Sequence, residues 1–206
     1  MASKPRLFAP NTIHHIYNRG SQKMTLFSQP KDYSYFLFKM QECKDRYPVE
    51  ILAYCLMPNH FHFLIREPGD FPQDLSRPLG SNIADFLHIL QTSYAKYFQA
   101  KHPDFSGRVF EGTYKSKLVE KDPYFLQLFA YIHDNPVRKG LVQKPESWPY
   151  SSYLGLIGVR RDDMITYDPD IVEISHQQIY EQFASSRKTH LEQLSPFLFH
   201  NTRHHA

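Results

Sequence analysis

The amino-acid sequence predicts an α+β domain built on an antiparallel sheet, and three observations support this class. Short runs rich in β-branched and aromatic residues alternate with longer segments of helical periodicity. The connections between them contain proline, glycine or asparagine, as turns do. Apolar residues make up 41% of the 206 positions, so the chain can bury a core that offsets its ordering entropy. The composition therefore excludes disorder for most of the length.

Six elements are predicted in the order strand, helix, strand, strand, helix, strand. The two helices have apolar residues three and four positions apart, and Met57-Pro58-Asn59 joins the middle strands as a tight hairpin. This order is the split βαβ plan of ferredoxin-like folds, an antiparallel sheet with helices on one face. The predicted bounds are 12–18 (strand), 31–46 (helix), 49–56 and 60–66 (strands), 82–102 (helix) and 115–120 (strand).

A further helix is predicted after the last strand. Asp122 is a suitable N-cap and Pro123 suits the first helical position. Because Pro136 disfavours α geometry in the residue before it, we expect this helix to stop near Asp134 or Asn135.

The charge divides the chain into two parts. Residues 1–144 carry 19 Lys and Arg against 13 Asp and Glu, whereas residues 145–206 carry 5 against 8. A mild basic excess is equally typical of a solvated surface and of a nucleic-acid partner. We predict one main domain over residues 1–158 and a C-terminal extension over 159–206 that is partly helical, around 175–190.

Several protein classes are excluded. The longest apolar runs fall far short of the roughly 20 residues that cross a bilayer, so no membrane partner is expected. The N-terminus has no apolar signal region, and a cytoplasmic location is expected. The two cysteines, Cys43 and Cys55, exclude a disulfide framework and a four-cysteine zinc site.

Two histidines, His60 and His62, alternate within the second strand of the hairpin. Their imidazoles point to one face of the sheet while Phe61 and Phe63 point to the other. Two neutral imidazoles on a stiff hairpin can share a divalent metal. Alternating histidines on a hydrated sheet face are the alternative interpretation.

The helix that begins at Asp122 carries a second candidate pair. Tyr131 and Asn135 are four residues apart, so the phenol and the amide share one flank of the helix. Alternatively, Tyr131 is a residue at the edge of the core, and Asn135 merely ends the helix before Pro136.

Several motifs resemble those of the REP-associated branch of the single-tyrosine transposases, which are HUH nucleases. The resemblance covers about residues 12–158, with the motifs in the family's order. The motifs are HHIYNRG (14–20), YCLMPNHFHFLI (54–65), SYAKYF (93–98), YIHDNPVRKGLV (131–142) and WPYSSY (148–153).

The resemblance implies a transposase that cuts single-stranded DNA beside a hairpin. His60, His62 and Asn135 would bind a divalent metal, Mg²⁺ or Mn²⁺, and Tyr131 would form a 5′-phosphotyrosine bond. The same donors also suit Zn²⁺, Ni²⁺ or Co²⁺. A phenol of pKa near 10 is a poor nucleophile at pH 7, so it needs an activated phosphate.

The expected partner is single-stranded DNA with a REP-like hairpin, in the cytoplasm at the nucleoid. Gly112-Thr113-Tyr114-Lys115 lacks the arginine usual in the family after the glycine, and neighbouring cations are expected to substitute. Aromatic side chains hold single strands by stacking. Candidate phosphate contacts are Arg19, Arg108, Lys115, Lys117, Arg138 and Lys139, and candidate stacking residues are Tyr17, Phe110 and Tyr114.

Two other functions fit the same residues. One is a non-cleaving binder of structured nucleic acid. The other is an ordinary metal-dependent phosphodiesterase in which Tyr131 only stacks. The sequence leaves the choice between a monomer and a homodimer open.

Overall fold

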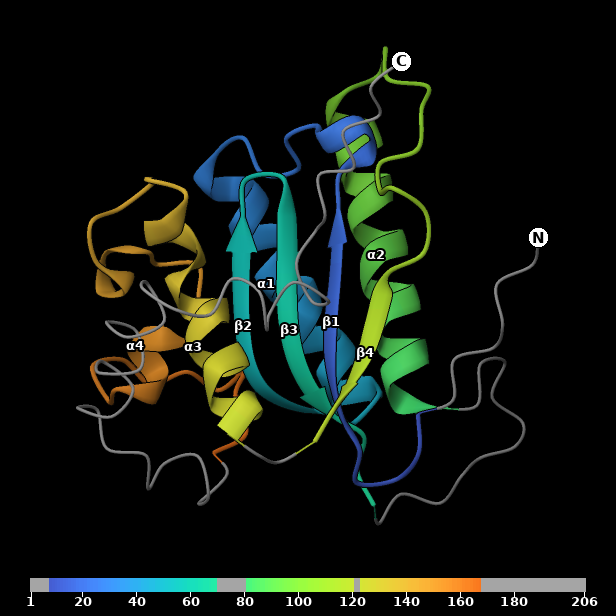
Figure 1. Ribbon diagram of the computed structural model, residues 1–206. Helices are drawn as coiled ribbons and strands as arrows, with labels where there is room; N and C mark the ends of the chain where they lie inside the picture. The colour runs from blue at the N-terminus through green and yellow to red at the C-terminus, as the bar shows by residue number, and fades with distance from the viewer. Residues whose placement is uncertain (1–7, 70–80, 121–122, 168–206) are drawn as a thin grey trace, which may run out of the picture.

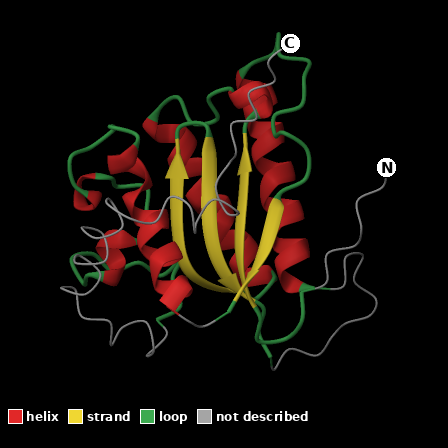
Figure 2. Cartoon of the chain, in the orientation of Figure 1, coloured by secondary structure: helices red, strands yellow, loops and turns green. Residues whose placement is uncertain are grey.

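A computed structural model of the chain describes residues 8–69, 81–120 and 123–167 (Figure 1). Within these residues four strands form one sheet that is flanked by helices (Figure 2). None of the described helices is both long enough and apolar enough to span a membrane. The elements are β1 (Ile13–Arg19), η1 (Ser21–Lys23), α1 (Pro30–Arg46), β2 (Glu50–Met57), β3 (His60–Arg66), α2 (Asn82–Lys101), β4 (Lys115–Val119), α3 (Pro123–Arg138), η2 (Pro145–Ser147) and α4 (Tyr153–Leu156).

The sheet has the strand order β2-β3-β1-β4, and each strand is antiparallel to its neighbours. With α1 between β1 and β2 and α2 between β3 and β4, this is the predicted ferredoxin-like α+β plan. The fold class is therefore confirmed. The predicted bounds of β3 match the observed ones. Those of α1, α2 and β4 differ by one residue at one end, and those of β1 and β2 are shifted by one residue at both ends.

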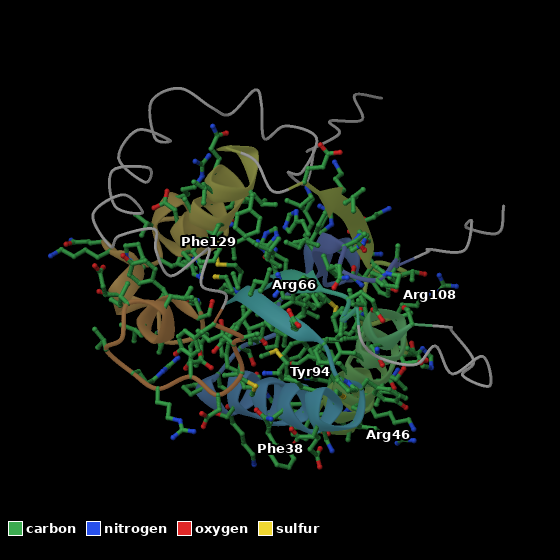
Figure 3. The ribbon with its side chains drawn as sticks, turned by 90° about the horizontal axis from the view of Figure 1, so that it is seen from below. Phe38, Arg46, Arg66, Tyr94, Arg108 and Phe129 are labelled. Atoms are coloured by element: carbon green, nitrogen blue, oxygen red, sulfur yellow. The ribbon has the colours of Figure 1, made fainter. Side chains whose placement is uncertain are left out.

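The helices α1 and α2 cover one face of the sheet, which we call the aromatic face. Side chains of the strands interdigitate there with aromatic rings such as Phe36 of α1 and Tyr94 of α2, both fully buried. Figure 3, seen from below, places Tyr94 between the sheet and α1. The strand residues of the aromatic face include Ile16, Phe61, Phe63 and Ile65.

The opposite face of the sheet carries the polar side chains, and we call it the histidine face. Ile13, Leu64 and Val119 pack here against α3 in a second apolar cluster. Because side chains alternate along a strand, every second residue from these positions lies on the same face. The polar residues of the histidine face are His15, Tyr17 and Arg19 on β1, His60 and His62 on β3, and Lys115 and Lys117 on β4.

The helix α3 lies along β2 on the histidine face (Figure 1), and Phe129 marks its position in Figure 3. Its apolar stripe, which includes Phe125, Leu128 and Ile132, is buried against the sheet. None of the described helices lies over β1 and β4 on this face (Figure 1). The histidine face is therefore only half covered by the described elements.

The predicted end of this helix is wrong, because α3 continues through Pro136 to Arg138. Proline has a φ close to that of a helix and removes only one backbone hydrogen bond. The Asn135 side chain donates from Nδ2 to the carbonyl oxygen of Tyr131 (3.0 Å), which adds a bond in the same turn. The chain leaves the helix at Gly140, whose φ of +69° suits glycine.

The described start of the predicted extension, residues 159–167, packs against the main domain. Ile165 is buried in the core of the aromatic face, and the Tyr54 hydroxyl donates to Asp162 (2.8 Å). The remainder of the predicted extension, with its expected helix at 175–190, lies outside the described residues.

Candidate functional site

The His60 and His62 side chains lie together on β3, next to the hairpin turn. Their ring centroids are 5.1 Å apart with nearly perpendicular planes, and both side chains are buried. The Nδ1 atom of His60 hydrogen-bonds to the Asn59 side-chain oxygen (2.7 Å), which fixes the ring. Strand alternation thus places the two imidazoles on one face, where α3 also packs.

Both imidazoles are neutral at pH 7. Burial lowers the pKa of His60 to about 4, and the nearby charges of Lys139 and Arg19 act in the same direction. Burial lowers the pKa of His62 as well, helped by His60 and His15. A neutral imidazole keeps a lone pair on one nitrogen, which is the form that binds a metal ion.

A third histidine, His15 of β1, contacts His62 directly. A hydrogen bond of 2.9 Å joins Nε2 of His15 to Nδ1 of His62, and the planes of the two rings are nearly parallel, with their centroids 5.1 Å apart. The Tyr17 ring lies beside both of them, 5.0 Å from His15 and 5.9 Å from His62. The sheet therefore holds a connected cluster of rings next to the histidine pair.

The phenol of Tyr131 reaches this cluster from α3. Its ring centroid lies 5.8 Å from that of His62, and the guanidinium of Arg138 lies 5.5 Å from the centre of the phenol ring. Burial raises the pKa of the Tyr131 phenol, while the Asn135 side chain and Arg138 counteract that rise. The hydroxyl is thus protonated at pH 7.

A buried hydrogen-bonded residue holds α3 against the sheet. His133, two positions after Tyr131, is fully buried, and its Nδ1 donates to the carbonyl oxygen of Phe129 (2.9 Å). Its Nε2 therefore accepts from the Ser152 hydroxyl, 2.8 Å away. Burial lowers the pKa of His133 to about 4, so the ring stays neutral and can accept this bond at pH 7.

The Ser152 hydroxyl is itself fixed to β2. The backbone N–H of Tyr54 donates to its oxygen (2.9 Å), and the backbone N–H of Ser152 donates to the Tyr54 carbonyl (3.0 Å). The indole N–H of Trp148 donates to the carbonyl oxygen of Leu56 (2.9 Å), two residues after Tyr54 on the same strand. Residues 148–152 thus cover the outer edge of β2 and link that strand to α3.

The structure brings most of the predicted DNA-binding residues to the histidine face. Arg19, Tyr17, Lys115 and Lys117 lie on its strands, and Arg19 pairs there with Glu111. Arg138 and Lys139 follow at the end of α3, close enough to act on Tyr131 and His60 respectively. The cations predicted to contact phosphates and the candidate catalytic residues therefore share one face.

Phe110 and Tyr114, two of the three predicted stacking residues, belong elsewhere. Both are buried in the core of the aromatic face, so their rings are packed against protein and not presented to a nucleic acid. Arg108 is exposed in the loop that follows α2. The placement of Phe110 and Tyr114 does not favour the predicted stacking role, because their hydrophobic rings fill space between the sheet and the helices.

The donor set suits a divalent metal with a mixed nitrogen and oxygen shell. Within the described residues, no group of three His, Cys, Asp or Glu side chains is arranged to hold a metal. Two neutral imidazoles and the Asn135 amide oxygen make the predicted set, which suits Mn²⁺ or Mg²⁺ with water completing the shell. A buried amide oxygen of Gln127, one helical turn before Tyr131, makes no hydrogen bond to the described residues. This flank of α3 therefore carries amide oxygens of the kind that ligate a hard divalent cation.

Sequence reasoning missed His15, His133 and Ser152. All three fall inside the motifs quoted above, but their roles depend on strand register and on packing between distant segments. The alternation of β1 places His15 and Arg19 on one face, and only the pairing of β1 with β3 shows that His62 lies there too.

Comparisons of the chain with family models and with known proteins point to the same family. A family model described as IS200-like transposase matches residues 10–135. The chain is similar to a REP-associated tyrosine transposase of Haemophilus influenzae, with 26% identity over 121 residues. That alignment covers 55% of this chain and 63% of the relative, less than two thirds of its length.

A solved structure has a similar fold. It is a REP-associated tyrosine transposase bound to a REP hairpin, with a TM-score of 0.56 and 16% sequence identity. The similarity covers 82% of this chain and 92% of that chain.

Proposed function

The chain belongs to the IS200-like transposase family, and from that premise we propose that it cleaves and rejoins single-stranded DNA beside a hairpin. Tyr131 is the proposed nucleophile, and the product is a 5′-phosphotyrosine bond. The observation that carries this proposal is the distance of 5.8 Å between the rings of Tyr131 and His62, which come from different elements. A phosphate held by a metal at the histidine pair would lie within reach of the phenol.

His60, His62 and Asn135 are the proposed ligands of one Mg²⁺ or Mn²⁺ ion. Such an ion, when bound, polarises the scissile phosphate and stabilises the charge that develops on its oxygens. The depressed pKa values of His60 and His62 support this role, since neither imidazole needs to lose a proton at pH 7 before it binds a cation.

In the proposed reaction, a phosphate ester bond to a DNA 3′ oxygen is replaced by a phosphate ester bond to Tyr131. Its oxygen bonds to phosphorus and loses its proton, and the bond from phosphorus to the 3′ oxygen breaks, so that a free 3′ hydroxyl leaves with a proton. Asn135 and Arg138 favour the ionised phenol, which assists the attack. Because the phosphotyrosine preserves the phosphodiester, the reverse attack by a 3′ hydroxyl reseals DNA without a nucleotide cofactor.

The histidine face is the proposed DNA interface. Its cations lie around the histidine pair and would contact phosphates, while Tyr17 is the remaining stacking candidate. The hairpin as substrate is supported by the solved relative with a similar fold, which is bound to a REP hairpin. Binding through phosphates should weaken steeply as salt rises.

The packing of α3 supports a site that is built from the residues of a single chain. This helix contacts β2 and β3 of its own sheet, and the bond from Ser152 to His133 fastens it there. A monomer is therefore sufficient for the proposed chemistry, while a homodimer stays the predicted alternative.

The direct test is formation of a covalent adduct. Incubation with labelled hairpin single-stranded DNA and Mn²⁺ should yield a protein–DNA species that resists denaturation. Replacing Tyr131 by Phe (Tyr131→Phe) should abolish it while hairpin binding persists, because only the nucleophilic oxygen is removed. Tyr35→Phe, on α1 behind the other face of the sheet, is the matched control and should retain the adduct.

Two outcomes would replace this proposal. Hairpin binding without an adduct under any metal would identify a non-cleaving binder of structured nucleic acid. Continued cleavage by Tyr131→Phe would identify an ordinary phosphodiesterase, in which the tyrosine only stacks.

A further inference from the structure

We propose that His15 is a positioning residue for His62: its Nε2 accepts a hydrogen bond from Nδ1–H of His62, so that Nε2 of His62 keeps the lone pair that binds the divalent cation. This inference rests on the proposed function, which makes His62 a metal ligand. It concerns a residue of β1, a different strand from the one that carries the ligand pair.

The geometry that carries the inference is set by the sheet. His15 and Tyr17 lie on the same face of β1, and Tyr17 is directly opposite His62 on β3. His15 is therefore the diagonal neighbour of His62, a position within reach of long side chains across antiparallel strands. The 2.9 Å hydrogen bond and the interplanar angle of 16° hold the His62 ring in one orientation.

The chemistry of neutral imidazole decides what this bond does. One ring nitrogen carries hydrogen and the other carries the lone pair that binds a metal. If Nδ1 of His62 donates to His15, its Nε2 keeps the lone pair and can bind the cation. If His15 donates instead, the His62 proton lies on Nε2, and that nitrogen cannot be a ligand. The direction of this bond therefore fixes the tautomer of His62, and a cation can bind Nε2 of His62 only when His15 is the acceptor.

The environment of the pair keeps the bond in place. Both side chains are fully buried, so water does not compete for the two nitrogens. Lys117 of β4 acts on His15 and opposes a positive charge on its ring. Partners of this kind, which hold the second nitrogen of a ligating histidine, typically change metal affinity by about 10- to 100-fold when removed.

The first measurement needs no variant. Nitrogen-15 NMR of the histidine rings in the full chain, with and without Mg²⁺, reports the protonated nitrogen of His62. We expect hydrogen on Nδ1 of His62 in the presence of Mg²⁺. Hydrogen on Nε2 under the same conditions would overturn the inference, whether or not the enzyme is active.

The second measurement is Mn²⁺ affinity by electron paramagnetic resonance, without DNA. His15→Leu removes the acceptor and should weaken Mn²⁺ binding by about 10- to 100-fold. His15→Gln keeps an amide oxygen as acceptor and should recover most of that loss. His14→Leu is the matched control, because His14 points to the opposite face of β1 and should leave Mn²⁺ affinity unchanged.

The variant His62→Ala separates this inference from the proposed function. If His62→Ala abolishes Mn²⁺ binding while His15→Leu binds like the wild type, the role of His15 is wrong and the proposed metal site stands. If His62→Ala binds Mn²⁺ like the wild type, the proposed metal site itself is wrong. Should His15→Leu fail to fold, the role of His15 is tested by the Mn²⁺ affinity of His15→Gln relative to the wild type and by the tautomer measurement.

Discussion

The two faces of the sheet receive different kinds of side chain from the same strand. Along β3, Phe61 and Phe63 enter an aromatic core that α1 and α2 seal, whereas His60 and His62 enter a polar cluster that α3 only half covers. Both sets of side chains are buried. The difference teaches that burial on the aromatic face stabilises the fold, while burial on the histidine face sets protonation states and ring orientations.

Two buried histidines on this side of the sheet form hydrogen bonds within the protein. His15 bonds to His62, and His133 bonds to Ser152, so each ring has a hydrogen-bond partner inside the protein. Burial keeps these rings neutral, since their pKa values lie well below 6.5. A neutral, hydrogen-bonded imidazole costs much less to bury than a charged one.

The largest expected effect lies on the aromatic face. Phe63→Ala should lower the free energy of unfolding by about 3 to 5 kcal/mol, because the fully buried ring leaves a cavity among other rings. Urea unfolding measures this change. Among molecules that remain folded, Mn²⁺ affinity should stay near the wild-type value.

Its counterpart on the histidine face is His60→Ala. It should cost less than about 2 kcal/mol of stability, because the interactions that it removes are mainly polar, among them the hydrogen bond to Asn59. It should nevertheless remove most of the Mn²⁺ affinity. Equal destabilisation by the two variants would contradict the division of roles between the faces.

An intermediate effect is expected where α3 meets β2. Ser152→Ala removes the donor to His133 and the acceptor of the Tyr54 N–H, so it should cost about 1 to 3 kcal/mol. Single-turnover adduct formation should slow because Tyr131 loses its fixed position, while the hairpin dissociation constant should change little.

Ser151→Ala is the matched control for that variant. Ser151 is equally buried, but its hydroxyl contacts are both long, at 3.4 Å. We expect it to change stability and adduct formation only slightly. If both serine variants slow adduct formation equally, the hydrogen bond from Ser152 to His133 does not position Tyr131.

The smallest effect concerns the part of the histidine face that no described helix covers. Lys115→Ala should weaken hairpin binding a few-fold and reduce the slope of log affinity against log salt by about one, as loss of one phosphate contact does. Fluorescence anisotropy across a salt series measures both quantities. Lys96→Ala, exposed on α2 behind the other face, should change neither.

The β3 hairpin and the α3 helix show how far sequence reasoning reaches. The alternation of HFHF, bounded by a Pro-Asn turn, predicts both the bounds of β3 and the shared face of His60 and His62. The end of α3 could not be predicted, since tertiary packing outweighs the local preference against helix before Pro136. Phe110 and Tyr114 lie outside long periodic segments, so their face follows only from packing.

The site residues divide in the same way. The spacing of Tyr131 and Asn135 indicates a shared flank, which the continued helix retains. The approach of Tyr131 to His62 depends on how α3 packs across β2, and no local pattern contains that information. The bond between His133 and Ser152 joins positions 19 residues apart and depends on the same packing.

The cover over the outer edge of β2 has a consequence for self-association. Residues 148–152 pair with the outer edge of β2, whereas β4 forms the opposite border of the described sheet. Two lysines, Lys115 and Lys117, flank this edge, and their like charges would meet if a second copy added its β4 there. Among the described residues, one border of the sheet is thus paired with the protein's own chain and the other is lined with lysines, whose mutual repulsion disfavours edge-to-edge pairing of folded molecules.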